Sequence, residues 1–439
     1  MENSVKSENQ NEPTYEAALQ SLFNLQKFGI KFGLSKTENL LKAFGNPHLG
    51  QNYIHIAGTN GKGSVATFLG SILREAGFKV GMYVSPHLVR FTERFRINNE
   101  EISREKAAQL IDELQAAFNP DEPPTFFEAV TAMAILYFAR EKTDVAIMEV
   151  GMGGRLDATN VITPLVTGIT NISMEHEEYL GNRLSHIAAE KAGVIKKGVD
   201  VVTSVTQPRI IEQLKAIAEE RGAPLWQVGK DMKYRSTASG LHYFGQGGAI
   251  NGLQPGLRGI HQARNAALAL GMIERIKTKG FSVSTDQIRE GLRKATWAGR
   301  MQVIKENPTI VLDGAHNPAA VKALARSIEA CFSYERMILV IGIMADKDIT
   351  GLLRAIVPMS DTVLYTRPVY SRAADPHVLK EKAPPSNATG EVIHSLSEAL
   401  ARAEEIASPR DLIVVCGSLF TVGEALTYFD RVRYKPDDQ

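Results

Sequence analysis

The sequence predicts an α/β fold of two units: a larger N-terminal unit on a mostly parallel, doubly wound sheet, and a smaller C-terminal unit of Rossmann-like type. Three observations predict it. Short apolar runs alternate with longer amphipathic stretches along nearly the whole chain. The runs are rich in Val and Ile and apolar on both faces, which is typical of parallel strands covered by helices. Polar or Gly-rich clusters directly follow several of them.

The expected strands are residues 53–57, 79–84, 145–150, 166–171, 200–204, 309–312, 337–343, 362–365 and 412–416. Residues 64–76 predict a helix because their apolar positions repeat at i, i+3, i+4 and i+7, and Gly77 then provides a helix stop. Similar patterns predict helices at 128–138, 261–277, 284–295, 319–331 and 397–406. Residues 232–259, which are Gly-rich with weak alternation, predict hairpins or irregular structure.

The chain of 439 residues is long enough for two or three domains. A new β-α series begins after residues 295–300. We therefore expect a polar tail over 1–14, a first domain over 15–297 and a second over 298–439.

Composition excludes several function classes. Lys plus Arg number 50 and Asp plus Glu 49, so a net charge of +1 gives no bulk attraction to nucleic acid or acidic membranes. The longest apolar run, 129–139, is too short to span a bilayer, and the N-terminus has no apolar leader. Cys331 and Cys416 lie far apart, which excludes a disulfide framework and a thiolate zinc site. We expect a cytoplasmic protein.

A phosphate-binding loop is the sharpest local signal. An apolar strand runs into a Gly-rich turn and a helix, the arrangement whose backbone N–H groups and helix terminus bind phosphate. The loop is Gly58, Thr59, Asn60, Gly61, Lys62, Gly63 and Ser64. It is shorter than the P-loop pattern G-x-x-x-x-G-K-[ST]. The alternative is a Gly-rich helix entry with a solvated lysine.

Glu149 follows the apolar residues 145–148 and precedes the segment GMGGRLDATN. A carboxylate inside an apolar strand is costly to bury unless it is paired or binds a cation, so it is a candidate Mg²⁺ ligand. The alternative is an edge-strand glutamate facing water. Leu156 stands where a dinucleotide-binding G-x-G-x-x-G motif needs glycine, so that motif is excluded.

Other polar clusters follow strands as well. His176 lies among carboxylates after residues 166–171 and could bind a metal or remain an ordinary loop histidine. The segment DGAHNP follows residues 309–312, and CGSLF ends the last strand. Ligands of open α/β sheets bind at the carboxyl ends of the strands, so we expect these clusters to meet.

These motifs resemble the folylpolyglutamate synthase/dihydrofolate synthase family of the Mur-type ligases. The resemblance covers about residues 20–425 and rests on GTNGKGS (58–64), SPHL (85–88), FTERFRIN (91–98), TFFE (125–128), EVGMGGRLDATN (149–160), IAAEKAGVIK (187–196), HQARNAALA (261–269), DGAHNP (313–318) and CGSLFTVGE (416–424).

The resemblance implies an ATP-dependent ligase with an active site between two domains. Its substrates would be L-glutamate and the carboxylate of dihydropteroate or of a folate polyglutamate, joined through an acyl phosphate. It implies ATP, one or two Mg²⁺ ions, a monomer, and neither nucleic acid nor membrane as a partner. Two alternatives stay open: a Mur-type ligase for another carboxylate, and a nucleotide-driven switch.

The resemblance also implies residue roles. Thr59–Lys62 would hold the triphosphate; Asn265, Arg300 and Asp313 would contact ATP; Ser85, Glu149 and His176 would bind Mg²⁺. Lys191 matches a carbamylated lysine, the alternative being an exposed helix lysine. The candidate catalytic residues are Lys62, Glu149, His176, Lys191 and His316.

For the pterin, the matching residues are Lys31, Phe32, Gly33, Leu34, Thr125, Phe126, Phe127, Glu128, Leu156, Asp157 and Ala158. Phe126 and Phe127 could stack on a flat heterocycle or pack in the core. His316 and Ser418 are candidates for the glutamate side, and either could instead cap a helix. Glu175 departs from the aspartate that many members carry before the histidine, and residues 371–373 depart from a version that contains proline.

Overall fold

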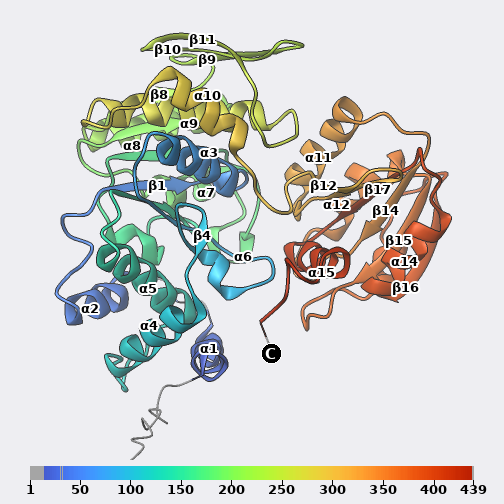
Figure 1. Ribbon diagram of the computed structural model, residues 1–439, viewed down its shortest axis with the longest axis horizontal. Coiled ribbons are helices and arrows are strands. Elements are labelled where there is room, and N and C mark those ends of the chain that lie inside the picture. The colour runs from blue at the N-terminus through green and yellow to red at the C-terminus, as the bar shows by residue number, and fades with distance from the viewer. Residues whose placement is uncertain (1–13, 30, 32, 438–439) are drawn as a thin grey trace, which may run out of the picture.

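The computed structural model describes residues 14–29, 31 and 33–437, and it contains two α/β units joined by a single crossing near residue 298 (Figure 1). Residues 1–13 of the expected polar tail and the candidate pterin residue Phe32 lie outside the described residues. Among the described residues, no helix has the length and apolar character needed to cross a membrane. Both cysteine thiols, Cys331 and Cys416, are free.

The larger unit is built on an eight-stranded sheet in the order β4-β3-β2-β5-β1-β6-β7-β8. Strands β2, β5, β1, β6, β7 and β8 are parallel to one another, whereas β3 and β4 form an antiparallel edge. Their bounds are β1 Tyr53–Ala57, β2 Val80–Tyr83, β3 Phe95–Ile97, β4 Glu100–Glu101, β5 Val145–Glu149, β6 Val166–Ile169, β7 Asp200–Thr203 and β8 Leu225–Gln227.

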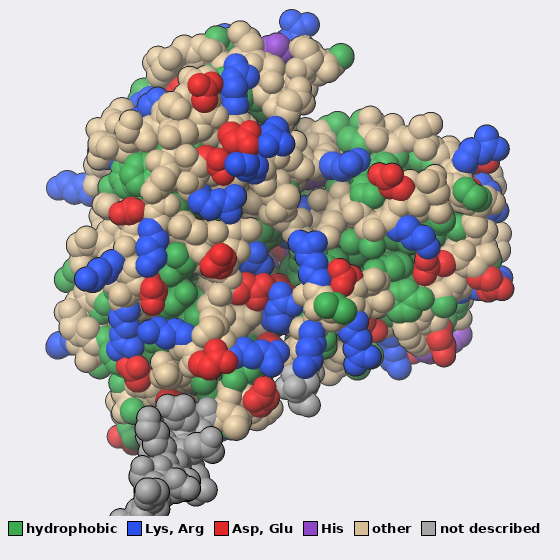
Figure 2. Space-filling model, in the orientation of Figure 1, with side chains coloured by type: hydrophobic (Ala, Val, Ile, Leu, Met, Phe, Trp, Pro, Cys, Tyr) green, Lys and Arg blue, Asp and Glu red, His purple; other side chains and the backbone are tan. Residues whose placement is uncertain are grey.

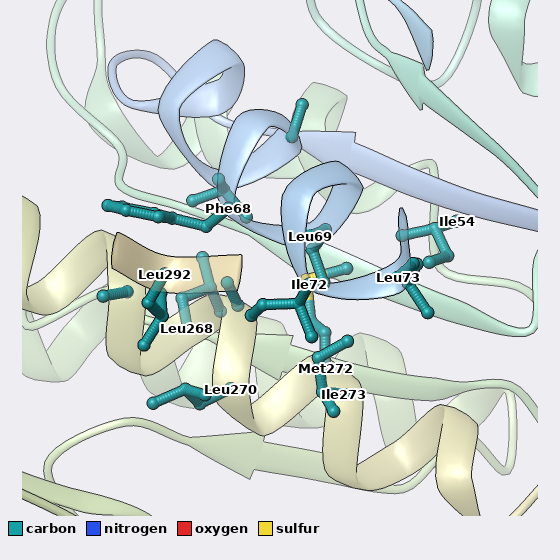
Figure 3. Close-up of a cluster of buried hydrophobic side chains, with 14 of the residues drawn as sticks. Ile54, Phe68, Leu69, Ile72, Leu73, Leu268, Leu270, Met272, Ile273 and Leu292 are labelled. Carbon is teal, nitrogen blue, oxygen red and sulfur yellow. The ribbon is translucent and has the colours of Figure 1, made fainter. Parts of the chain in front are cut away.

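Helices cover both faces of this sheet because its central strands are apolar on both sides. Ile54 and Ile147 belong to a core that they share with α3 Lys62–Glu75, α9 Gln262–Lys277 and α10 Thr285–Lys294. Figure 3 shows part of this core. Tyr53 and Met148 face the opposite core. The helices on that side are α1 Tyr15–Phe23, α2 Ser35–Ala43, α4 Arg104–Ala116 and α5 Phe126–Arg140.

The remaining elements of the larger unit lie around this core. The helices α6 Glu177–Leu180, α7 Leu184–Ala192 and α8 Pro208–Glu220 enclose a third apolar cluster. The short helices are η1 Asn24–Phe28, η2 Phe91–Arg94 and η3 Ala158–Val161. An antiparallel sheet of β9 Lys233–Thr237, β10 Gly240–Gly245 and β11 Gly248–Leu253 packs on α9. This sheet lies within residues 232–259, for which the sequence predicted either hairpins or irregular structure.

The smaller unit has a six-stranded sheet in the order β12-β13-β17-β14-β15-β16, parallel except for β12. Its strands are β12 Gln302–Lys305, β13 Thr309–Leu312, β14 Met337–Ile341, β15 Thr362–Arg367, β16 Thr389–Ser395 and β17 Leu412–Cys416. Its helices are α11 Pro318–Cys331, α12 Ile349–Ile356, η4 Val357–Met359, α13 Pro376–Glu381, α14 Leu396–Ile406 and α15 Leu419–Phe429.

The predicted fold class is confirmed: two α/β units, the larger on a mostly parallel sheet. Each of the nine expected strands is present, and those at 53–57, 309–312 and 412–416 have the expected bounds. The sequence analysis missed β3, β4, β8, β12 and β16. All five lie at or next to a sheet edge, where a strand needs few apolar residues.

Candidate active site

A cavity of about 560 Å³ opens between the two units, along the groove visible in Figure 2. The carboxyl ends of β1, β5 and β6 line it from the larger unit, and the residues after β13 line it from the smaller one. Thirteen candidate residues meet there: Thr59, Asn60, Gly61, Lys62, Gly63, Ser64, Ser85, Glu149, His176, Asn265, Arg300, Asp313 and His316. Most of the polar clusters that were expected to meet at the carboxyl ends of the strands therefore line this one cavity.

The glycine-rich loop is shaped by close backbone approaches. Gly61 adopts φ +88°, a conformation that favours glycine, and a Cβ there would lie 2.7 Å from the Asn265 side-chain oxygen. Lys62 begins α3, and its Nζ donates to the carbonyls of Gly58 at 3.1 Å and Thr59 at 3.3 Å. The ammonium group of Lys62 therefore lies over the loop, where a triphosphate would bring negative charge.

Glu149 lies at the buried end of β5, between β2 and β1 in the middle of the sheet. The alternative of a solvent-facing glutamate on an edge strand is therefore wrong. Its carboxylate is 3.9 Å from Lys62 Nζ. Burial raises the pKa of Glu149, while the positive charges of Lys62 and Arg300 act in the opposite direction. A buried carboxylate with one distant cation partner retains free lone pairs for a metal ion.

The loop after β6 brings a carboxylate and two imidazoles together. Glu175 Oε1 lies 3.1 Å from His316 Nε2 and 3.9 Å from His176 Nε2, so it links the two units. Burial raises the pKa of Glu175, but the hydrogen bond and charge of His316 outweigh it and the pKa lies below its usual range. Burial lowers the pKa of His176 to about 4, so the ring is neutral and fit to bind a metal at neutral pH.

Lys191, on α7, is buried beneath the glycine-rich loop, so the alternative of an exposed helix lysine is wrong. Its Nζ donates to the Gly58 carbonyl at 2.9 Å, and Lys62 donates to the same oxygen. Burial and then the charge of Lys62 lower the pKa of Lys191 to about 7. Lys191 does not line the cavity itself.

A pair of side-chain amides joins the loop to the smaller unit, and the sequence analysis missed its second member. Asn317 Nδ2 donates to Asn60 Oδ1 at 2.8 Å, and Asn60 Nδ2 donates to Asn317 Oδ1 at 3.2 Å. The same Asn317 oxygen caps α11 by accepting from Ala320 N. Asn171, also missed, accepts from Asn60 N at 2.9 Å. Asn171 follows β6, so the strand-end rule could have found it.

Asp313 binds backbone of the smaller unit close to the crossing between the units. Its carboxylate accepts from Met301 N at 2.9 Å and from Ala315 N at 2.9 Å. Arg300, the residue before Met301, lines the same cavity. The two candidate ATP contacts Arg300 and Asp313 therefore lie next to each other, close to the crossing between the units.

None of the candidate pterin residues that the structure describes belongs to the cavity lining. Thr125 and Glu128 form the capping box of α5. Phe126 stacks on Phe23 with a centroid distance of 5.5 Å, and Phe127 packs against Gly151. The Asp157 carboxylate accepts from Met152 N at 2.9 Å and from Thr159 N at 3.0 Å, and so holds its own loop.

Of the remaining pterin and glutamate candidates that the structure describes, His316 lines the cavity and the others do not. Lys31 is exposed, while Gly33 and Leu34 precede α2 and are partly buried. Leu156 and Ala158 flank Asp157 next to η3. Ser418 is the N-cap of α15 and accepts from Thr421 N at 3.0 Å, as its alternative stated. His316 lines the cavity, and Asn317 rather than His316 caps α11.

The candidate metal ligands are a carboxylate, an imidazole and a hydroxyl: Glu149, His176 and Ser85. Among the described residues, no three His, Cys, Asp or Glu side chains converge as a complete metal site. Mg²⁺ prefers few protein ligands and fills its shell with water and phosphate oxygens, so this mixed set fits it.

Comparisons with known proteins show what this chain is similar to. Residues 56–273 match the Mur ligase middle domain, and residues 299–419 match the Mur ligase glutamate ligase domain. A Halobacterium salinarum protein named probable bifunctional folylpolyglutamate synthase/dihydropteroate synthase is 38% identical over 96% of this chain. The chain spans about half of that relative, 52% of its length, and 51% of a Haloferax volcanii relative with the same name.

Other relatives match over their full length. The Bacillus subtilis dihydrofolate synthase/folylpolyglutamate synthase is 32% identical, over 93% of this chain and 98% of that protein. The Escherichia coli FolC structure in complex with DHPP and ADP has a TM-score of 0.87 and 32% identity, covering 96% of this chain and 100% of that one. The Yersinia pestis bifunctional synthase complexed with AMPPNP and Mn ion has a TM-score of 0.85 and 31% identity, covering 96% and 99%. This chain belongs to the folylpolyglutamate synthase/dihydrofolate synthase family of the Mur ligases.

Proposed function

We propose that this chain is an ATP-dependent ligase that joins L-glutamate to the carboxylate of dihydropteroate and of folate polyglutamates, releasing ADP and phosphate. The observation that carries the proposal is one cavity in which a phosphate loop and Glu149 from the larger unit face Arg300, Asp313 and His316 from the smaller one. We infer that residues 15–297 bind ATP and the pterin, and that residues 298–439 contact ATP and glutamate.

The first step activates the carboxylate of the acceptor. A carboxylate oxygen attacks the γ-phosphorus of ATP, the bond to the β–γ bridging oxygen breaks, and an acyl phosphate and ADP result. The loop residues Thr59–Lys62 would hold the triphosphate, and Lys62 would neutralise the charge that builds on its oxygens. Asn265 lies against Gly61, which supports a contact of Asn265 with the nucleotide.

The second step forms the amide bond. The uncharged amine of glutamate attacks the acyl carbon, loses a proton, and displaces phosphate. His316 is held by Glu175 and by the Gly314 carbonyl, with its Nδ1 2.8 Å from that oxygen. Both ring nitrogens lie within hydrogen-bond distance of an acceptor, so the ring is held in place at the cavity wall. We infer that His316 lies on the glutamate side of the cavity.

A divalent cation, Mg²⁺ in the cell, would bind at Glu149, His176 and Ser85 and neutralise phosphate charge when present. We also infer that Lys191 is carbamylated. Its neutral amine would add CO₂, form an N–C bond and release one proton. The product keeps one N–H for the Gly58 carbonyl and places a negative charge beside Lys62. That exchange of charge would relieve the repulsion between the two ammonium groups.

The pterin ring would bind beside α5, against Phe126, Phe127 and the loop of Leu156–Ala158. We infer that Lys31–Leu34 also contributes to the pterin site. Because the Asp157 carboxylate is occupied by backbone N–H groups, we infer that this segment offers its backbone and shape to the ring.

The test is ADP release with ATP, Mg²⁺ and L-glutamate, comparing 7,8-dihydropteroate with a reduced folate as acceptor. Turnover that needs both glutamate and an acceptor supports the ligase, and turnover with both acceptors supports both activities. ADP release at the same rate without acceptor and glutamate would contradict the ligase and favour a nucleotide-driven switch. Amide product from a different carboxylate alone would favour the other Mur-type alternative.

A further inference from the structure

A second cavity of about 340 Å³ adjoins the active-site cavity on the side of β3 and β4. The two share Pro86, Arg300 and Leu419 in their linings. The walls of the second cavity are the segment after β2, the crossing between the units and the C-terminal segment at Arg433 and Tyr434. We call it the linker cavity.

The C-terminal wall of the linker cavity is anchored in both units. The Asp437 carboxylate accepts from Phe91 N at 2.7 Å and from Arg104 at 3.3 Å, both in the larger unit. Tyr434 is buried in the core of the smaller unit, and its hydroxyl accepts from Gln302 Nε2 at 3.2 Å. The wall is therefore part of the fold, and the cavity has a defined shape.

The lining carries excess positive charge, from Arg90, Arg96, Arg300 and Arg433 against Glu93 and Glu101. Glu101 pairs with Arg90 at 2.8 Å and with Arg96 at 3.6 Å, and Glu93 accepts from three backbone N–H groups. Arg300 and Arg433 have no carboxylate partner within 4.0 Å among the residues that the structure describes. Figure 2 shows Lys and Arg side chains gathered along the groove between the units.

His87 adds an N–H donor to this lining. Its Nδ1 accepts from Arg94 Nε at 2.9 Å, so in the neutral ring the proton resides on Nε2. No described residue accepts a hydrogen bond from Nε2, which leaves that N–H for a ligand.

We propose that the linker cavity binds the γ-glutamyl tail of a folate polyglutamate. The proposal rests on the proposed ligase function and specifies which substrates that site prefers. Each γ-linked glutamate adds one α-carboxylate, and guanidinium and imidazole N–H groups recognise carboxylates through charge-assisted hydrogen bonds. Dihydropteroate has a single carboxylate, which must lie at the ATP γ-phosphate. It therefore has no further carboxylate that could bind in the linker cavity.

The decisive variant is Arg433→Gln, which removes an exposed, unpaired charge from the lining. Its matched control is Arg431→Gln, because Arg431 is exposed on the same segment and does not line the cavity. KM is measured for dihydropteroate, a folate monoglutamate and a folate triglutamate. We expect Arg433→Gln to raise KM for the triglutamate about fivefold, to leave KM for dihydropteroate unchanged, and to shorten the product chains.

Three results would overturn the tail site and leave the ligase standing. They are an equal change for all three acceptors, no change for any, and the same triglutamate effect from Arg431→Gln. Wild-type turnover with dihydropteroate but with no folate would also overturn the tail site alone. An absence of glutamate-dependent ADP release with every acceptor would instead overturn the proposed function, and the tail site with it.

Discussion

Carbamylation of Lys191 gives a prediction whose size follows from the structure. Burial and Lys62 lower the pKa of Lys191 from 10.5 to about 7. At pH 7.5 about three quarters of such an amine is uncharged, against about 0.1% for a free lysine. Since only the uncharged amine adds CO₂, the reactive fraction of Lys191 exceeds that of a surface lysine by several hundredfold.

The assay is ¹³C NMR of the protein equilibrated with ¹³C-bicarbonate at pH 7.5. We expect one carbamate carbonyl signal, which Lys191→Arg abolishes and which weakens as the pH falls below 7. The matched control is Lys294→Arg, because Lys294 is exposed and its hydrogen bond with Glu75 raises the pKa of its ammonium group. Absence of the signal in the wild-type protein, or its survival in Lys191→Arg, would refute the reasoning.

Three further predictions concern the loop, the joint between the units and the core. Lys62→Ala should lower kcat for ADP release by two to four orders of magnitude, about 3–5 kcal/mol, with an unchanged Tm, because it removes a charge contact to the transferred phosphoryl group. Asn317→Asp should raise KM for ATP about tenfold with little change in Tm, because aspartate still caps α11 but cannot donate to Asn60. Burial lowers the pKa of His55 to about 3. Above pH 6.5 this has no effect on stability, but between pH 6.5 and 3 the unfolded chain takes up a proton that the folded one does not. The contribution of His55 to the free energy of unfolding should thus fall by about 1.6 kcal/mol from pH 6.5 to 5, measured by urea titration of the wild type and of a variant without this histidine.

Each of these has a control. Lys62→Arg should keep more activity than Lys62→Ala, and a near-normal kcat in Lys62→Ala would contradict the loop assignment. Asn317→Ala should lower Tm as well, because it also loses the cap; a normal KM in Asn317→Asp would show that the amide pair does not matter. His55→Thr should remove the His55 contribution to the pH dependence. An identical pH dependence in this variant and the wild type would contradict a neutral buried His55.

The fold could be predicted where local patterns determine it. Strands β1, β13 and β17 are buried throughout or nearly so, and their apolar runs show it in the sequence. The edge strand β16 has no buried residue, only exposed and partly buried ones, so its pairing depends on β15 rather than on its own composition. The glycine-rich loop was also predictable, because its backbone conformation requires particular residues.

The site was less predictable than the fold. The rule that ligand-binding residues follow strands places Glu149, His176, Asp313 and His316 at one cavity, and the structure places them there. The burial of Lys191 depends on how α7 packs under the loop, which no local pattern reveals. The same holds for Asp157, whose carboxylate serves its own loop, and for Glu175, which reaches His316 from 141 residues away.

The most direct test of the central claim is the fate of the oxygen atoms of the acceptor carboxylate. The acceptor is labelled with ¹⁸O in that carboxylate and incubated with ATP, Mg²⁺ and L-glutamate, and the released phosphate is analysed by mass spectrometry. Because the acyl phosphate breaks at the acyl carbon, we expect one ¹⁸O in each phosphate and one in the new amide carbonyl. Unlabelled phosphate alongside ADP would contradict the account, because it would show that water, rather than the acceptor carboxylate, attacks ATP.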